Sequence, residues 1–151
     1  AIAQYAPIHN TYLRFAPDLA APLNRNWGNE TRSTGIRVPD ISPQARRLEI
    51  RFPGVDANPY LAFAASLACG YLGMKKKIAP TEPHGGDAFQ EPITVARSLE
   101  AALGLLESSD DLSNVMGNRF AKAYAAVKRE EFEAFNKVIS SWEREFLLLD
   151  V

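Results

Sequence analysis

The stretch "ARRLEIRFPG", residues 45–54, together with the apolar run that follows it, decides the fold. Its middle alternates strictly, so a strand here would carry charged residues on one face and apolar residues on the other: Arg47, Glu49 and Arg51 against Leu48, Ile50 and Phe52. Such a row of charges has two explanations, a solvated face with an ion pair or a site for charged ligands. The choice depends on the residues that surround it.

After Gly54 the sequence becomes helical in character. Asn58 is a favourable N-cap, Pro59 suits the first helical position, and residues 60–74, "YLAFAASLACGYLGM", are apolar nearly all round. This pattern predicts a helix over 58–77 that is buried inside a larger body, with Cys69 as a small buried residue. Three lysines at 75–77 would complement the dipole at the C-terminal end of the helix.

The residues before the alternating stretch predict a loop and a strand. Residues 1–22 contain three prolines and no sustained period, which indicates a mostly irregular segment. Residues 24–38 read as a strand with an irregularity near Asn29 or Gly35, ended by Pro39, and we expect it to pair antiparallel with the strand around Glu49. A bulge at Gly35 would bring Arg32 and Arg37 to one side of the sheet.

The rest of the chain predicts a loop followed by helices. Residues 79–93 are rich in proline and glycine, and Ser98 is expected to cap a short helix that ends near Glu107. A long final helix is predicted from apolar residues spaced three and four apart between Phe120 and Trp142. The fold class is therefore α+β, with antiparallel strands followed by a buried helix and long carboxyl-terminal helices.

Composition sets broad limits on the class of protein. The 151 residues are 46% hydrophobic and 23% charged, with a net charge of -1, which is ordinary for one soluble globular domain. The longest weakly polar run is shorter than the roughly 20 residues that a bilayer requires, so no membrane partner is expected. A single cysteine and the absence of a recognisable secretory signal fit a cytoplasmic location.

The basic residues are distributed unevenly along the chain. Residues 1–51 contain seven arginines, no lysine and four acidic residues, whereas all six lysines lie further on. Arginine binds oxyanions through a planar, bidentate fork, while solvated surfaces usually mix arginine with lysine. The first third of the chain therefore predicts a site for phosphate or carboxylate groups.

Four segments carry a resemblance to a known family. They are "NTYLRFAP", "NETRSTGIRVP", "ARRLEIRFPGVDANPYLAFAASLACGYLG" and "YAAVKREEFEAFNKVISSWEREFLL". Together they resemble the carboxyl-terminal part of the glutamine synthetase family, from about Asn10 to Leu148. The resemblance implies an ATP-dependent ligase that joins the side-chain carboxylate of glutamate to ammonia or a primary amine through a γ-glutamyl phosphate, with Mg²⁺ or Mn²⁺. It also implies a homo-oligomer of stacked rings.

The resemblance assigns roles to six residues. Glu49 matches a metal-ligand glutamate, and Arg47 matches an arginine that contacts the phosphates of the nucleotide. Arg51 matches the arginine that holds the carboxylate being phosphorylated, and Arg14 matches one that binds glutamate. Arg32 and Arg37 match arginines that stabilise the transferring phosphoryl group and the polyphosphate of ATP. Phosphoryl transfer depends on positioning and charge neutralisation, which explains so many cations in one site.

The chain departs from the family pattern at two positions. Ammonia-using members carry a glutamate where this chain has Ala20, on a flap that closes the glutamate entrance and helps to take a proton from ammonium. In lacking this glutamate, the chain resembles relatives that ligate glutamate to polyamines or other primary amines. Phe89 stands where regulated bacterial members have a tyrosine that receives a nucleotidyl group, so this form of control is not expected here.

The first half of the family's catalytic domain has no counterpart in the sequence. Its Glu-x-Glu strand, two further glutamates, a histidine and a small amino-terminal domain are all unmatched. We therefore expect residues 1–151 to be the carboxyl-terminal portion of a larger ligase subunit, and to be inactive alone.

Two other functions stay open at this point. The chain could belong to a non-catalytic relative that keeps the fold for binding or regulation. It could also be an arginine-rich nucleic-acid binder that stacks bases on its aromatic residues, Tyr12, Phe15, Trp27 and Phe52. The expected position of Phe52 on the core face and the negative net charge disfavour the latter, so no nucleic-acid partner is expected.

Overall fold

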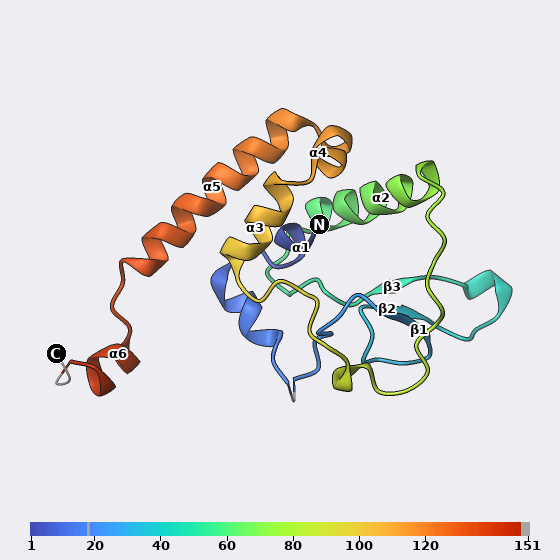
Figure 1. Cartoon of the computed structure of the whole chain (residues 1–151), viewed down its shortest axis with the longest axis horizontal. Helices are drawn as coiled ribbons and strands as arrows, with labels where there is room; N and C mark the ends of the chain where they lie inside the picture. Colours follow the sequence, from blue (N-terminus) through green and yellow to red (C-terminus); the bar gives the residue numbers. More distant parts are fainter. Residues whose placement is uncertain (18, 149–151) are drawn as a thin grey trace.

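A computed structural model describes residues 1–17 and 19–148 and shows an α+β fold (Figure 1). This confirms the predicted fold class. The helices are α1 (Ile2–Tyr5), α2 (Pro59–Lys75), α3 (Leu99–Glu107), α4 (Asp110–Met116), α5 (Asn118–Asn136) and α6 (Ser141–Phe146). The strands are β1 (Trp27–Asn29), β2 (Ile36–Val38) and β3 (Glu49–Ile50), and short 3₁₀ segments cover His9–Arg14, Pro43–Ala45 and Ala88–Gln90.

The three strands form one sheet in the order β1, β2, β3. The predicted antiparallel pairing is confirmed for β2 and β3, where Arg37 lies opposite Glu49. The prediction of one strand over 24–38 is wrong, because the chain turns through residues 30–35 and β2 returns parallel to β1. The irregularity expected near Asn29 or Gly35 is therefore a complete turn rather than a bulge.

The alternating stretch forms less strand than expected. Only Glu49 and Ile50 pair with β2, and the apolar face is not uniformly covered. Phe52 is buried and Ile50 is half-buried, whereas Leu48 is 67% exposed, contrary to the prediction of a common core face. The two-residue length of β3 explains this, since Leu48 lies before the paired residues and gains no cover from the sheet.

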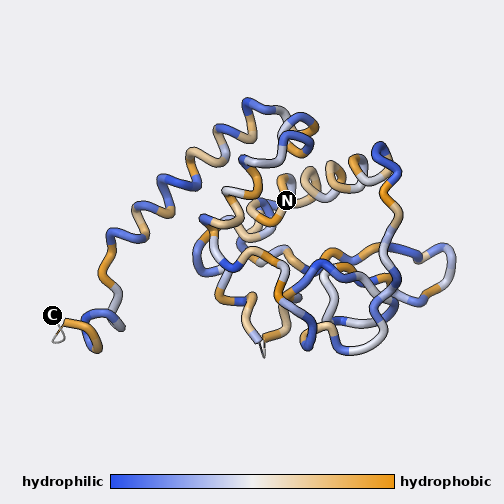
Figure 2. Tube along the Cα trace, in the orientation of Figure 1, coloured by the Kyte–Doolittle hydropathy of each residue, from blue (hydrophilic) through white to orange (hydrophobic). Residues whose placement is uncertain are grey.

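Helix α2 begins as predicted but has different surroundings. The side chain of Asn58 accepts hydrogen bonds from the backbone N–H groups of Tyr60 and Leu61, and Pro59 is the first helical residue. Figure 2 shows a largely hydrophobic colouring along α2, but within this chain only its small residues Ala65 and Ala68 are buried. Its exposed large side chains are those of Tyr60, Phe63, Leu67, Tyr71 and Met74.

The predicted burial of Cys69 is wrong, because this residue of α2 is exposed. The reason is geometric: the helix packs through a narrow stripe of alanines, and Cys69 lies outside that stripe. None of the helices in the described ranges is both long and apolar enough to cross a membrane.

The amino-terminal segment contributes to the core. Ala3, Tyr5, Tyr12 and Phe15 are all buried in the main apolar cluster. The hydroxyl of Tyr5 shares a hydrogen bond of 2.9 Å with that of Ser66 in α2. Helix α1 thus packs against α2 and α3, and residues 1–15 join the core although they contain only one short helix and one 3₁₀ segment.

The carboxyl-terminal helices agree with the prediction only in part. Helix α3 runs from Leu99 to Glu107 and the Ser98 side chain accepts a hydrogen bond from Ala101 N, as predicted. The predicted single helix through Trp142 is wrong, since α5 ends at Asn136 and Trp142 belongs to the separate helix α6. Ser140 begins α6 with a capping box, which accounts for the interruption. Figure 1 shows α5 leading away from the other helices, with α6 beyond its end.

Candidate functional site

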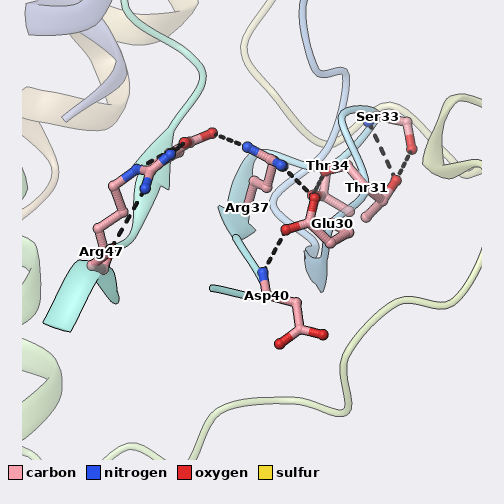
Figure 3. Close-up of polar contacts among 9 residues, drawn as sticks. Glu30, Thr31, Ser33, Thr34, Arg37, Asp40 and Arg47 are labelled. Carbon is pink, nitrogen blue, oxygen red and sulfur yellow. Dashed lines mark hydrogen bonds and ion pairs between the residues drawn. The ribbon is translucent and has the colours of Figure 1, made fainter. Parts of the chain in front are cut away.

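A network of ion pairs centres on Arg37 in β2 (Figure 3). Its Nη1 donates a hydrogen bond of 2.7 Å to Oε2 of Glu49 in β3, and its Nη2 donates to Oε2 of Glu30. The other oxygen of Glu49 accepts from Nε and Nη2 of Arg47, at 3.0 and 2.8 Å. The Arg37 side chain is only 13% exposed, so two carboxylates compensate a nearly buried cation.

These contacts fix the charge state of both carboxylates. The hydrogen bond from Arg37 lowers the pKa of Glu49, and the bond from Arg47 adds to this effect. The pKa of Glu30 is lowered by its hydrogen bond from Arg37 and by the one from the backbone N–H of Asp40. Both acids are therefore ionised at neutral pH.

Arg51 directly follows β3 and contacts the segment of the chain that precedes β1. Its Nη2 donates to the carbonyl oxygen of Ala20 at 3.3 Å. Burial lowers the pKa of Arg51, and repulsion from Arg32, Arg37 and Arg14 lowers it further.

Two donors in this region have no partner in the part of the chain that the structure describes. They are Nε of Arg37 and Nη1 of Arg51, and both atoms are buried. A buried, charged N–H group without an acceptor is costly. A phosphate or carboxylate oxygen is the acceptor that guanidinium groups bind best, so these two donors fit an anionic ligand.

Arg14 reaches the same region from the amino-terminal segment. It ends the 3₁₀ segment His9–Arg14, and its Nη1 donates to the carbonyl oxygen of Phe52 at 3.4 Å. Thr11 of the same segment donates to the carboxylate of Asp56. These contacts hold the amino-terminal segment against the residues that follow β3.

Arg32 is exposed, but the residues beside it are held by the loop over 79–93. Ser33 is buried, and its Oγ accepts a hydrogen bond of 2.8 Å from Ala88 N. The carbonyl of Ala88 in turn accepts from Nδ2 of Asn24 at 2.6 Å. Thr31 also donates to the carbonyl of Gly86, at 3.4 Å. This loop therefore supports the backbone that carries Arg32.

Of the six residues that the sequence indicated, Arg37, Glu49 and Arg47 are joined by direct ion pairs, and Arg14 bonds to the carbonyl of Phe52, the neighbour of Arg51. Arg32 is exposed, and the nearby residues Thr31 and Ser33, rather than its own side chain, bond to the loop over 79–93. The individual roles of the six residues stay predictions. The sequence analysis missed Glu30 and Ser33, which lie in the turn between β1 and β2. The available signal was the concentration of polar residues around Arg32 in "NETRST".

The described residues contain no group of three or more histidine, cysteine, aspartate or glutamate side chains arranged to hold a metal ion. Glu49 offers carboxylate oxygens, the ligand type that Mg²⁺ and Mn²⁺ prefer. Both oxygens already accept hydrogen bonds from arginines, so a metal ion would have to compete with Arg37 and Arg47.

Comparison with known proteins gives a consistent result. Residues 1–147 match the family described as glutamine synthetase, catalytic domain. A glutamine synthetase of Methanocaldococcus jannaschii is 37% identical over 146 residues, covering 91% of this chain and 32% of that protein. A glutamate–isopropylamine ligase of a Pseudomonas species is 36% identical over 145 residues, covering 93% of this chain and 32% of that protein.

The fold is similar to that of a solved structure as well. The structure of apo GmaS without ligand superposes with a TM-score of 0.83 at 30% identity, covering 97% of this chain and 34% of that one. The chain thus spans about a third of the length of the curated relatives that it matches.

Proposed function

The chain belongs to the glutamine synthetase family, and on this premise we propose that residues 1–151 are the carboxyl-terminal portion of the catalytic domain of a longer ATP-dependent ligase. The whole protein would join the side-chain carboxylate of glutamate to ammonia or a primary amine. The observation that carries this proposal is the group of arginines with two buried, unpartnered donors beside an ionised Glu49.

The arginines suit a reaction between two anions. An oxygen of the glutamate carboxylate attacks the γ-phosphorus of ATP, ADP leaves, and a γ-glutamyl phosphate forms. Arg14 and Arg51 would hold glutamate, while Arg37 and Arg47 would bind the phosphates and Arg32 would neutralise the transferring phosphoryl group. Repulsion between carboxylate and phosphate opposes this step, and fixed cations offset it.

The second step needs a neutral amine. Its nitrogen attacks the acyl carbon, phosphate leaves, and the amine loses a proton to give the amide. The residue at position 20 bears on which amine is used. Ala20 is exposed and its carbonyl lies 3.3 Å from Nη2 of Arg51, so position 20 adjoins the residue assigned to the reacting carboxylate.

We infer from Ala20 a preference for a primary amine over ammonia, because an alanine cannot bind ammonium or accept its proton. Overall identity does not discriminate between these substrates. The Methanocaldococcus glutamine synthetase and the Pseudomonas glutamate–isopropylamine ligase are almost equally similar to this chain.

Among the residues that the structure describes, Glu49 is the one to which the proposal assigns a divalent cation. When bound, it would neutralise phosphate charge in the first step. Glu49 would supply one ligand, and the remaining ligands would come from the rest of the longer protein. Assembly into a homo-oligomer and location in the cytoplasm likewise stay predictions.

The two alternatives differ in their support. Tyr12, Phe15 and Phe52 are all buried, so three of the four aromatic residues cannot stack on bases, and the nucleic-acid alternative loses its basis. A non-catalytic relative would have no chemical need for both unpartnered arginine donors and the acidic partner beside them, although it could share the fold.

The deciding experiment compares the full-length protein with the 151-residue chain. Each is incubated with glutamate, ATP, Mg²⁺ and a panel of amines, and phosphate release and amide product are measured. We expect amine-dependent turnover from the full-length protein and none from the 151-residue chain. No turnover by the full-length protein with any amine would favour the non-catalytic alternative, and turnover by the short chain would refute its assignment as an incomplete catalytic unit.

A further inference from the structure

Glu30 pairs with Arg37 through a different guanidinium nitrogen from the one that Glu49 contacts. Glu30 follows β1, whereas Glu49 belongs to β3, and the two carboxylates contact different nitrogens of the guanidinium. Figure 3 shows Arg37 lying between the carboxylate of Glu30 and the carboxylate that Arg47 contacts. Arg37 therefore has two acidic partners that belong to separate elements.

The backbone at Glu30 is unfavourable for a residue with a side chain. Its φ is 57°, in the left-handed region that glycine occupies readily and glutamate does not. A glycine would make this turn with less strain. The glutamate side chain compensates, since Oε1 accepts from Asp40 N and Oε2 accepts from Arg37. Glutamate is thus useful here for its carboxylate rather than for the turn.

The two partners of Arg37 would be affected differently by a metal ion. In the proposed function Glu49 binds a divalent cation, and that cation would repel Arg37 and compete with it for the same oxygens. Glu30 lies on the other side of Arg37 and is not needed as a ligand. It would remain bonded to Nη2, leaving Nη1 and the unpartnered Nε free for phosphate oxygens.

We propose that Glu30 is a positioning residue that keeps Arg37 directed toward the phosphates of the nucleotide when Glu49 binds the metal ion. This inference rests on the proposed function and adds to it a residue that the sequence analysis did not select. It acts through Arg37 and touches no reacting atom. Its contribution to nucleotide affinity should therefore depend on whether the metal ion is present.

The first test uses Glu30→Gly in the full-length protein, because glycine relieves the backbone strain while removing the carboxylate. Affinity for ATP is measured by calorimetry with Mg²⁺ and with EDTA, alongside the unfolding temperature. We expect an unfolding temperature no lower than that of the wild type. Affinity should fall about tenfold with Mg²⁺, the size expected for one charge-assisted hydrogen bond, and less than about twofold in EDTA. Equal affinity of Glu30→Gly and wild type with Mg²⁺ would overturn the inference.

A second test needs no metal ion. In EDTA, Glu30→Gln and Glu49→Gln each leave Arg37 with one carboxylate, whereas the double variant leaves none. We expect the double variant to lose more ATP affinity than the product of the two single losses, since either acid alone can hold Arg37. Independent, multiplicative losses would contradict the inference.

The control is Glu107→Gln. Glu107 pairs with Arg129 between α3 and α5 and is 42% exposed, close to the 48% of Glu30. Glu107→Gln should leave ATP affinity unchanged under both conditions. Failure of the proposed function would be visible in the wild type, which would bind no ATP at all. Failure of this inference alone would leave the wild type active and Glu30→Gly indistinguishable from it.

Discussion

Arg37 and Glu49 face each other across the β2–β3 pair and are joined by a hydrogen bond of 2.7 Å. This cross-strand contact answers the question that the charged row of the sequence raised. Glu49 forms an ion pair with Arg37, and the same carboxylate is the one that a metal ion would use in the proposed function. The ion pair and the metal site are therefore successive states of one residue in the proposed function, rather than competing explanations.

Replacing Glu49 by glutamine should separate these states. The variant keeps the shape and removes the charge. The full-length protein should stay folded, since Glu30 still compensates the charge of Arg37. The Mg²⁺ concentration needed for half-maximal rate should rise by about tenfold or more, because a neutral amide is a poor ligand for a hard cation. Steady-state rates over a range of Mg²⁺ concentrations measure this. If Glu49→Gln leaves the Mg²⁺ requirement unchanged, Glu49 has a purely structural role. Glu107→Gln is the control variant and should leave that requirement unchanged.

Ser33 offers a test of how Arg32 is held. Ser33→Ala leaves the buried N–H of Ala88 without its acceptor, which should cost about 1–3 kcal/mol of stability. We expect kcat to fall more than KM for ATP rises, because Arg32 acts on the transferring phosphoryl group in the proposed function. Ser33→Thr restores the hydroxyl and should recover most of kcat.

The control for Ser33→Ala is Ser108→Ala. It removes a hydroxyl at the end of α3 whose hydrogen bond is exposed, and it should change neither kcat nor KM. If Ser33→Ala lowers only the amount of folded protein and leaves kcat per folded molecule unchanged, then Ser33 supports folding and does not position Arg32.

The sequence predicted local features that depend on neighbouring residues. The cap at Asn58, the cap at Ser98 and the pairing of the strand at Glu49 all follow from short-range chemistry, and all three are confirmed. The parallel return of β2 beside β1 was not predictable in this way. It depends on contacts between residues 23–34 and the loop over 79–93, such as the hydrogen bond from His84 N to Trp27 O.

Burial was harder to predict than secondary structure. The apolar composition of α2 indicated a buried helix, yet Phe63 and Leu67 are exposed within this chain. Hydrophobicity shows that a residue is favourable in an apolar environment, but not which segment supplies it. The same limit applies to Glu30, whose importance depends on its distance from Arg37 in space and not on its position in the sequence.

Gly35 shows how closely the turn packs against the strand region. A Cβ at this position would lie 2.2 Å from Cζ of Phe52 and 2.7 Å from the backbone oxygen of Asn24. Gly35→Ala should therefore lower the free energy of unfolding of the full-length protein by about 1–3 kcal/mol. Gly104 lies in the middle of α3, and an added Cβ would meet no atom within 4 Å apart from its chain neighbours and the backbone of its own helix, so Gly104→Ala should raise the free energy of unfolding by up to about 1 kcal/mol. Chemical denaturation measures both, and equal effects of the two substitutions would contradict the packing described here.

Position 20 provides the sharpest test of substrate choice. An amine attacks only in its neutral form, so an enzyme that uses ammonia benefits from a carboxylate that binds ammonium and takes its proton. A larger amine can instead be positioned by contacts along its chain. Because Ala20 adjoins Arg51, we expect the full-length enzyme to prefer a primary amine, and Ala20→Glu to shift the preference toward ammonia.

The measurement is kcat/KM for ammonia and for a panel of alkylamines and polyamines, with wild type and Ala20→Glu, since this ratio compares transition-state binding directly. Ala101→Glu adds the same charge at an exposed position of α3 and should leave the preference unchanged. A shift of tenfold toward ammonia in Ala20→Glu corresponds to about 1.4 kcal/mol in transition-state free energy. A wild type that already favours ammonia by that factor would mean that another residue supplies the base, and that Ala20 does not determine the amine.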